Sequence, residues 1–495
     1  MEKKPVWPVF RMIIFLGQLF FQALSTTLVL RLNMLPGKFV ALFLGAMVVL
    51  AVCTGLLVFM NVTGKLDLWR KIISGVLAFM IMLGCAGILR VALDARKLVD
   101  DVTGDFGNTR NTYIIVLPDN TVESVKETKG YRYGVLEDFD LEHTQQMIDL
   151  IQKEIGEQIN LINYQQASVM LEALFNREVD ALIMHGVSLS LMIEQPGYED
   201  LLSRIRVLHT LPYKDVEPED NSNKETLRDS FVMYISGSDT RSTYLNGGLS
   251  DTNILAAVNP NTKQVLLVNT PRDYYVPNPA GNGALDKLTH CGNYGIECSV
   301  EALETLYQIE VDHYMQINFT GFKKLIDAID GITVYSDQAF TAVTGTYFQK
   351  GENILDGQKA LDFARERYNL RGGDDTRGQN QMRVIGAVVD KLSSSKTIIS
   401  NYSEILDSLE GMFVTNFTRE EISDFVKAQL EEMGPWTVRS FAVTGTGGYA
   451  ETYSWKGEEL YITWPDEAGV AYASNLISRI LTGEILTVED LTMPE

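Results

Sequence analysis

The stretch NILAAVNPNTKQVLLVNTPRD, residues 253–273, contains two apolar runs that are separated by Asn-Pro-Asn-Thr. These residues favour turns, so the two runs are predicted to form neighbouring antiparallel strands. A third apolar run, FVMYISG at 231–237, precedes them and completes an up-down-up meander. Downstream, runs of strand length alternate with helical patterns at 300–307, 321–329 and 356–364. The alternation predicts an α/β domain that is built on this meander.

Three ionisable residues stand at matching ends of the predicted strands. Asp239 follows the first strand, Asp251 precedes the second, and Arg272 follows the third. Because these ends of antiparallel strands meet at one edge of a sheet, we expect the three side chains to lie together. Two carboxylates beside an arginine suit a hard cation such as Mg²⁺ that holds a phosphorylated ligand. The alternative interpretation is that both aspartates cap turns in loops.

A second group of charges lies in FARERYNLRGGDDTRGQNQMR, residues 363–383, which places five arginines in a chain of net charge −22. Arg365 and Arg367 are two positions apart, so an extended segment would project both side chains to one side. Asp375 or Thr376 is predicted to cap the helix that follows. The stretch therefore contains an extended turn and a helix start.

On that helix, four residues are spaced as a single face: Arg377, Gln381, Val384 and Val388. A buried arginine and glutamine at a helix start are costly unless an anion meets them, and helix N-termini attract anions. The alternative is a solvated charged loop, which fits Arg371 and Arg383 better than Arg377.

The first 100 residues differ in kind from the rest of the chain. They contain 11 Lys and Arg against 4 Asp and Glu, which leaves 31 against 60 for the remainder. Long uncharged runs predict three transmembrane helices at about 9–30, 39–62 and 72–93, each able to cross a hydrocarbon core of about 30 Å. A secretory signal is the alternative for the first run, but that run is too long and two more follow.

Basic residues predict the orientation of these helices. Three precede the first helix and three lie between the second and the third: Lys3, Lys4, Arg11, Lys65, Arg70 and Lys71. Both groups belong in the cytoplasm by the positive-inside rule, so we expect a multi-pass protein of the cell membrane with a cytoplasmic N-terminus and an extracytoplasmic acidic body. An acidic body excludes general nucleic-acid binding, because phosphate backbones are held by clustered Lys and Arg.

Composition divides the chain into a membrane anchor at 1–97, an accessory domain at 98–214 and a polar linker at 215–230. A second domain follows, with a core at 231–395 and a C-terminal part at 396–495. The accessory domain is predicted to be a smaller α/β unit with a mostly parallel sheet. Its phrase ALFNREVDALIMHG resembles a turn of periplasmic solute-binding domains, so ligand binding is one interpretation and a spacer or docking role is the alternative.

Other chemistries lack their signatures. The five histidines show no HExxH or paired spacing, so no zinc site is expected. The chain contains neither a GxSxG elbow nor a GxxxxGK[ST] loop, which argues against a serine hydrolase and a P-loop NTPase. Cys291 and Cys298 enclose a short loop, where a disulfide and two separate thiols are equal alternatives.

Six ordered motifs resemble the LytR-CpsA-Psr family of bacterial cell-wall enzymes. They are ISGSDT at 235–240, SDTNILAAVNPNTKQVLLVNTPRDYYVP at 250–277, DKLTH at 286–290, NFTGFKKLIDAIDGI at 318–332, LDGQKALDFARERY at 355–368 and DTRGQNQ at 375–381. With its three anchors and its extra α/β domain, the chain most resembles the capsule-associated CpsA branch. The resemblance implies a catalytic domain with a mixed sheet.

The resemblance also implies an extracytoplasmic phosphotransferase that moves a glycan polymer, expected to be capsular polysaccharide, from a polyisoprenyl diphosphate carrier to peptidoglycan. It assigns Mg²⁺, with Mn²⁺ as the alternative, to Asp239 and Asp251, and it assigns catalysis to these two residues with Arg272. The diphosphate would be bound by Arg272, Arg365, Arg367, Arg377, Gln381 and Lys287. Asn380 departs from the family pattern, which has an arginine there. Capsule-assembly proteins are further implied partners.

Two other functions stay open at this stage. A membrane-bound regulator of capsule synthesis would sense a ligand through the accessory domain, although no sizeable cytoplasmic domain is apparent. A lipid-diphosphate pyrophosphatase would use the same site with water as the acceptor. For a lipid carrier, we expect an apolar groove lined by the helices at NFTGFKKLIDAI and VIGAVVDKL.

Overall fold

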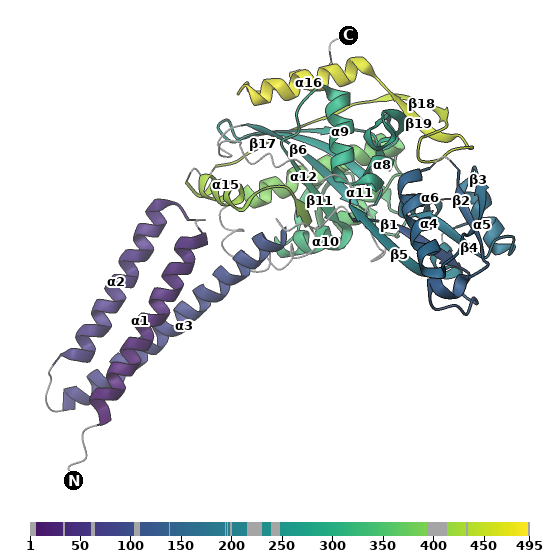
Figure 1. Cartoon of the computed structure of the whole chain (residues 1–495). Helices are drawn as coiled ribbons and strands as arrows, with labels where there is room; N and C mark the ends of the chain where they lie inside the picture. The colour runs from purple at the N-terminus through teal and green to yellow at the C-terminus, as the bar shows by residue number, and fades with distance from the viewer. Residues whose placement is uncertain are drawn as a thin grey trace.

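The computed structural model describes residues 6–32, 35–60, 65–102, 109–137, 139–193, 195, 197–198, 200–214, 230–238, 248–393, 413–431 and 434–493. It comprises a bundle of three long helices, a small α/β domain and a larger α/β domain (Figure 1). Both α/β domains lie at one end of the bundle, and α1 (Val6–Leu32) begins at the other end.

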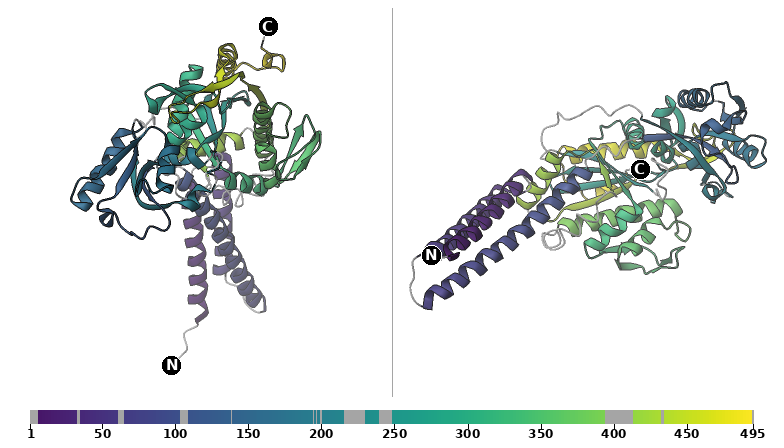
Figure 2. Two further views of the ribbon diagram at one scale, coloured as in Figure 1. Left: turned by 90° about the vertical axis from the view of Figure 1, so that its right-hand side faces the viewer. Right: turned by 60° about the horizontal axis from the view of Figure 1, so that its bottom comes forward.

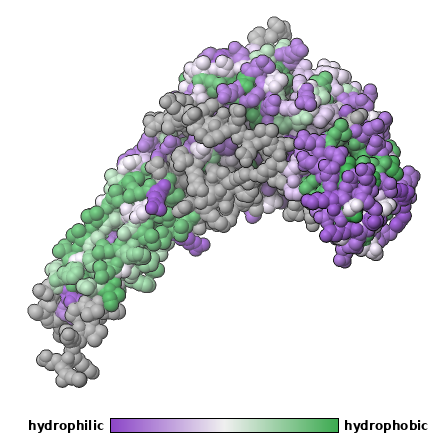
Figure 3. All heavy atoms as spheres, in the orientation of Figure 1, coloured by the Kyte–Doolittle hydropathy of each residue, from purple (hydrophilic) through white to green (hydrophobic). Residues whose placement is uncertain are grey.

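The bundle consists of three helices that are long and apolar enough to cross a membrane, as predicted. The candidate spans are Arg11–Leu32 in α1, Gly37–Phe59 in α2 (Gly37–Phe59) and Asp67–Leu93 in α3 (Lys65–Val102). Apolar side chains cover the outside of the bundle (Figure 3). Polar side chains face inward, where Gln18 Nε2 donates to Thr54 Oγ1 at 2.9 Å. Pairing these groups with each other avoids exposing them to lipid.

The C-terminal end of α2 is held by arginines from both neighbouring helices. Arg70 of α3 donates to the carbonyl oxygens of Leu57 at 2.9 Å and Met60 at 2.5 Å. Arg11 of α1 donates to the carbonyl oxygen of Val58 at 2.8 Å. The last carbonyls of a helix lack intrahelical donors, so the two arginines satisfy them and tie the three helices together.

The accessory domain is a five-stranded sheet in the order β3-β2-β4-β1-β5. Its strands are β1 (Thr109–Val116), β2 (Arg132–Leu136), β3 (Asn160–Tyr164), β4 (Ala181–His185) and β5 (Arg206–Lys214). β2 pairs in parallel with β3 and β4, whereas β1 is antiparallel to β4 and β5. β5 therefore runs in the same direction as β2, β3 and β4, and β1 alone runs the other way. The prediction of a mostly parallel sheet is confirmed in strand direction, with antiparallel pairing on both sides of β1. Parallel pairing needs a crossover, and the long crossover helices of this sheet, α4 (Leu141–Ile155) and α5 (Ala167–Phe175), join β2 to β3 and β3 to β4.

The larger domain is built on a six-stranded sheet in the order β16-β11-β6-β7-β8-β17. The predicted meander is confirmed: β6 (Phe231–Ser238), β7 (Ser250–Asn259) and β8 (Gln264–Asn269) are successive antiparallel neighbours. β11 (His313–Asn318) joins β6 in parallel, and β17 (Thr437–Ala442) joins β8 in parallel. The sheet is therefore mixed, as the resemblance implied. β16 (Phe413–Thr415) and β17 show that the C-terminal part supplies both edges.

Alternation along the meander divides its side chains between two hydrophobic cores. Tyr234, Leu255 and Leu266 belong to the core that also contains side chains of α9 (Ile296–Tyr307) and α16 (Glu467–Leu481). Ile235, Ile254 and Val265 belong to the opposite core, which includes Met382 of α12 (Gly373–Ser393). Because both faces are buried, the strands read as continuous apolar runs.

Two further sequence-based expectations concern loops of this domain. Cys291 and Cys298 are both buried free thiols, so the structure contains the separate-thiol alternative. Most of the predicted linker, residues 215–229, lies outside the described part of the chain.

Candidate active site

The edge of the sheet where β7 begins and β8 ends brings together the first predicted site residues. Arg272, three residues after β8, donates from Nη1 to Asp251 Oδ1 at 2.6 Å. The meander thus places these two residues together, as predicted. Asp239 lies outside the described residues, so its expected place beside Asp251 stays a prediction.

Asp273 is a member of this site that sequence reasoning missed. Its Oδ1 lies 2.6 Å from Lys287 Nζ, and its Oδ2 lies 3.8 Å from Arg272 Nε. Burial acts to raise the pKa of Asp273, but Lys287 and Arg272 outweigh burial and lower it overall. Burial likewise acts to lower the pKa of Arg272, and Asp251 and Asp273 raise it overall. Asp273 therefore holds Arg272 and Lys287 beside each other, and its position next to Arg272 in the sequence was the available signal.

The first turns of α12 contribute a second cation to the same edge. Arg377 and Gln381 are buried on one face with Val384, as predicted. Burial lowers the pKa of Arg377, Asp374 counters this effect, and the positive charges of Arg272 and Arg367 add to the lowering. Because the charge of Arg272, after β8, lowers the pKa of Arg377, at the start of α12, the two guanidinium groups lie close enough to interact.

The start of α12 corrects one prediction. The helix begins at Gly373, so Asp375 and Thr376 lie inside its first turn rather than at the cap. Thr376 Oγ1 donates to the carbonyl oxygen of Arg371 at 2.6 Å, and Asp374 forms an ion pair with Arg377. Acidic residues in the first turn are favoured by the helix dipole, which explains the earlier start.

The turn between α11 (Gly357–Arg365) and α12 carries the other two predicted arginines. Arg365 is the last residue of α11 rather than part of an extended segment, and its guanidinium lies 4.3 Å from the ring centroid of Phe319. Arg367 Nη2 donates to Tyr368 Oη at 2.7 Å. Glu366, between them, is 4% exposed. The alternation therefore turns both arginines outward and the glutamate inward.

The remaining two arginines of the 363–383 stretch differ from each other. Arg371 is exposed, as expected of a solvated residue. Arg383 is half-buried, forms an ion pair with Asp337 and donates to Asn380 Oδ1 at 3.0 Å. Arg383 therefore differs from the expected solvated loop residue, because it lies within α12 and only 26% of its side chain is exposed.

Several buried polar atoms around this edge have no hydrogen-bond partner within the described residues. They are Ser238 Oγ, Arg272 Nε, Arg377 Nε and Asn380 Nδ2. An unpaired buried donor costs about 1–3 kcal/mol, and more when the group is charged. Unused guanidinium donors from two separate elements are therefore suited to a ligand with anionic oxygens, such as a phosphate.

An apolar groove runs from this cluster between the sheet and two helices. Phe319 and Phe322 of α10 (Phe319–Ala328) line it on one side, and Val384 and Ile385 of α12 line it on the other. Both helices are the ones expected to line a groove. Arg365 and Gln381 also belong to its lining. A single ligand could therefore place an apolar chain in the groove and an anionic head at the arginines.

The donor set can be compared with the needs of Mg²⁺. Asp251 supplies one carboxylate, and the described residues contain no group of three or more His, Cys, Asp or Glu side chains suited to a metal ion. Mg²⁺ usually binds through one or two carboxylates together with substrate phosphates and waters, not in an all-protein cage. The described residues therefore fit a Mg²⁺ ion only if a phosphorylated ligand shares it.

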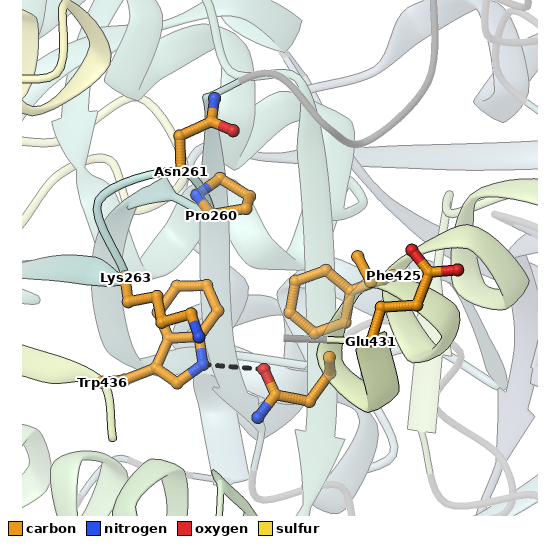
Figure 4. Close-up of a pocket in the computed structure, with 8 residues that line it drawn as sticks. Pro260, Asn261, Lys263, Phe425, Glu431 and Trp436 are labelled. Carbon is orange, nitrogen blue, oxygen red and sulfur yellow. Dashed lines mark hydrogen bonds between the residues drawn. The ribbon is translucent and has the colours of Figure 1, made fainter. Parts of the chain in front are cut away.

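A separate pocket lies at the β7–β8 turn, next to α15 (Arg419–Glu431) (Figure 4). Trp436 Nε1 donates to Gln429 Oε1 at 2.9 Å, and Phe425 forms another wall. Of the eight lining residues, only Lys263 and Glu431 carry charges. This pocket contains none of the predicted site residues, so we assign the active site to the sheet edge.

Comparison with known proteins gives consistent matches to one family. Residues 209–464, more than half of the chain, match the LytR_cpsA_psr family. A protein of Enterococcus faecalis named polyisoprenyl-teichoic acid--peptidoglycan teichoic acid transferase TagU is 34% identical over 227 residues, which are 46% of this chain and 72% of that protein. The protein of the same name from Oceanobacillus iheyensis is 33% identical over 236 residues, with coverages of 46% and 72%.

Solved structures with similar folds include the crystal structure of B. subtilis TagV. It is 24% identical to this chain, with a TM-score of 0.43, and the match covers 52% of this chain and 99% of that chain. The family match begins at residue 209, so nearly all of the accessory domain lies outside it.

Proposed function

The chain belongs to the LytR-CpsA-Psr family, and from this premise we propose that it transfers a glycan polymer from a polyisoprenyl diphosphate carrier to peptidoglycan, on the outer side of the membrane. The two relatives named above are described as transferases of polyisoprenyl-linked teichoic acid to peptidoglycan. We propose capsular polysaccharide as the polymer of this chain, because its three membrane helices and accessory domain resemble the capsule-associated branch.

The observation that carries the proposal is the meeting of an apolar groove with a cationic cluster. Arg365 and Gln381 line the groove, and Arg377, on the same face of α12 as Gln381, lies within the electrostatic reach of Arg272. A polyisoprenyl diphosphate has this combination of an apolar chain and an anionic head. The groove would hold the first isoprene units, and the arginines would hold the diphosphate.

The proposed reaction is attack by a peptidoglycan hydroxyl on the phosphorus that carries the glycan. A new oxygen–phosphorus bond forms, the bond to the bridging oxygen breaks, and polyisoprenyl monophosphate leaves. Arg272, Arg377 and Lys287 would neutralise the charge that develops on the phosphate oxygens, with Arg367 at the rim. A carboxylate oxygen of Asp251 or Asp239 that does not bind the metal ion proposed below would accept the hydroxyl proton.

We propose that Mg²⁺, or Mn²⁺ in its place, is held by Asp239 and Asp251 and shared with the diphosphate. When bound, the ion would supply further charge neutralisation at the phosphate oxygens. Asp251 would then exchange its present partner, the Arg272 guanidinium, for the ion, and Arg272 would turn to the phosphate.

The test replaces Arg272 in the full chain, purified in detergent with a synthetic lipid-diphosphate glycan, peptidoglycan fragments and Mg²⁺. Arg272→Ala should lower the transfer rate by at least about 100-fold, since it removes a preorganised charge from the transition state. Arg371→Ala, which changes an exposed arginine of the neighbouring turn, is the matched control and should leave the rate unchanged.

Mass spectrometry of the products separates the candidate activities. A phosphodiester between glycan and peptidoglycan supports transfer, whereas free phosphorylated glycan means that water is the acceptor. Absence of both products, or an unchanged rate in Arg272→Ala, would refute the proposed function and favour a regulator of capsule synthesis.

A further inference from the structure

A cleft separates the accessory domain from the loop between β18 (Gly445–Ala450) and β19 (Leu460–Pro465) of the larger domain. The accessory domain lines it with six residues: Leu136, Glu137, Phe139, Gln165, Ala167 and Ser188. The larger domain lines it with Glu451 and residues 453–457. The cleft volume is about 230 Å³, smaller than the roughly 300–1,000 Å³ of pockets that enclose a whole drug-sized ligand. It is therefore sized for one unit of a larger ligand.

The cleft lies where the topology of the accessory sheet favours ligand binding. Glu137, Gln165 and Ser188 follow the carboxyl ends of β2, β3 and β4, the three strands that pair in parallel with one another. The chain leaves β2 for β3 on one side and then crosses to β4 on the other side. In open α/β sheets, ligands bind at the carboxyl ends of the strands where the connections change direction.

Three polar side chains on the accessory-domain side of the cleft have no hydrogen bond to other described residues. The Ser188 side chain is 2% exposed, lines the cleft and makes no hydrogen bond within the described part of the chain. Glu137 and Gln165 likewise have no side-chain partner there, and both are exposed. A ligand that bonds to these three side chains would therefore not have to break a hydrogen bond between described residues.

The lining combines these polar groups with aromatic rings. The rings of Phe139 and Tyr453 face each other across the domain boundary with centroids 6.1 Å apart, and Trp455 lies two residues further on. Glu137 and Glu451 disfavour an anionic ligand, since Lys456 is the one cation of the lining. A ligand with many hydroxyl groups and apolar ring faces matches this mixture of acceptors, donors and aromatic surfaces.

We propose that this cleft binds a saccharide unit, which belongs either to the glycan polymer or to the glycan strand of peptidoglycan. The choice of these two sources rests on the proposed function, whereas the saccharide chemistry rests on the lining. The accessory domain thereby becomes a glycan-binding module rather than a spacer.

A short strand connects the cleft with the active site. In β10 (Ala284–Lys287), Asp286 accepts hydrogen bonds from the hydroxyl and the backbone N–H of Ser454, a residue of the cleft lining. The next residue, Lys287, forms the ion pair with Asp273 of the active site. One residue of the cleft lining, Ser454, is thus hydrogen-bonded to the sequence neighbour of Lys287, which is expected to hold the diphosphate.

The test measures binding to the full chain in detergent by saturation-transfer difference NMR and by calorimetry. Three probes are compared: disaccharide-peptide fragments released from peptidoglycan by muramidase, delipidated capsular oligosaccharide, and a mixture of free amino acids. We expect binding of one saccharide probe and no binding of the amino acids. The saccharide that binds identifies the source.

The test variant is Glu137→Ala/Gln165→Ala/Ser188→Ala, which should weaken saccharide binding by at least about tenfold, because it removes three hydrogen-bonding groups. Glu123→Ala is the matched control, since Glu123 is exposed and follows β1, whose carboxyl end lies at the opposite edge of the sheet. Glu137→Ala/Gln165→Ala, which changes exposed residues alone, covers the case in which the triple variant does not fold.

Three results would overturn the proposal. They are no saccharide binding by the wild type, saccharide binding by both cleft variants that is as tight as that of the wild type, and binding of the amino acids instead of a saccharide. Arg272→Ala keeps the cleft intact and should bind saccharide normally while it loses transfer. Saccharide binding by a wild-type chain without transfer activity would refute the proposed function and leave the cleft assignment standing.

Discussion

Gly378 lies where α12 packs closely against Asn269, the last residue of β8. A Cβ atom added there would overlap the side-chain amide of Asn269. Although Ala is the better helix former by about 1 kcal/mol, we predict that Gly378→Ala lowers the free energy of unfolding by about 1–3 kcal/mol, because the closely packed site must shift. Denaturant unfolding of the purified chain measures the change.

Gly386 provides a control on the same helix. A Cβ atom added there would lie 3.6 Å from Val438 Cγ1, which is ordinary van der Waals contact. Gly386→Ala should therefore leave the stability unchanged or raise it by up to about 1 kcal/mol. Equal effects of the two substitutions would contradict the close approach at Gly378.

Individual site residues were predictable only where local geometry fixes their partners. The pairing of Asp251 with Arg272 follows from the meander, since the start of its second strand and the end of its third must meet. The pairing of Asp273 with Lys287 does not follow, because Lys287 belongs to β10, whose position depends on tertiary packing. Asp239 belongs to the same prediction but lies outside the described residues.

At the scale of elements, the turn between α11 and α12 is ordered by one buried carboxylate. Glu366 accepts hydrogen bonds from the backbone N–H groups of Val343 at 2.6 Å, Arg367 at 3.0 Å and Asn369 at 2.9 Å. We predict that Glu366→Ala releases this turn and raises the KM for the lipid-linked donor by about tenfold, because Arg365 and Arg367 lose their fixed positions. Steady-state kinetics at varied concentrations of the lipid-linked donor measures this KM.

A change in KM without a change in kcat distinguishes a positioning role of Glu366 from a general loss of structure. Glu366→Gln keeps an acceptor oxygen and should recover most of the donor affinity. Glu352→Ala, at an exposed residue of the same domain, should change neither constant. An equal loss in both Glu366 variants, or a fall in kcat alone, would argue against this role.

Helices and strands were predicted correctly where the sequence pattern was compatible with one structure only. The meander and the three membrane helices were correct because their apolar runs were bounded by turns or charges. The accessory sheet is mostly parallel as predicted, but the reversed direction of β1 was not predictable. Strands and helices that alternate in sequence do not determine that direction, and the connection from β1 to β2 contains no long helix. The start of α12 was misplaced by about one turn, since Asp375 or Thr376 was predicted as the cap whereas the helix begins at Gly373.

At the scale of the whole molecule, the two α/β domains share one hydrophobic core. It extends from Tyr113 and Leu189 of the accessory domain to Leu255 and Leu476 of the larger domain. The polar stretch at 215–230 suggested separate units, but sequence patterns contain no information on which faces of two domains meet. Deleting residues 111–213 would therefore expose part of this core. Point variants of the cleft are the cleaner way to separate a sensor from a glycan-binding module.

The arrangement of the bundle makes the predicted orientation testable in intact cells. Both α/β domains lie at the end of the bundle opposite to the start of α1 (Figure 2), so we expect them on the side of the membrane opposite to the basic residues that are predicted to be cytoplasmic. Lys350, an exposed residue of the larger domain, should face the outside, and Leu68, at the start of the third span, should face the cytoplasm. Lys350→Cys should react with a membrane-impermeant maleimide on cells whose wall has been digested, whereas Leu68→Cys should react only after permeabilisation.

The wild-type chain is the background control, because Cys291 and Cys298 are buried and Cys53 lies within a span. Labelling of Leu68→Cys before permeabilisation, with none at Lys350→Cys, would invert the orientation and place the active site away from peptidoglycan.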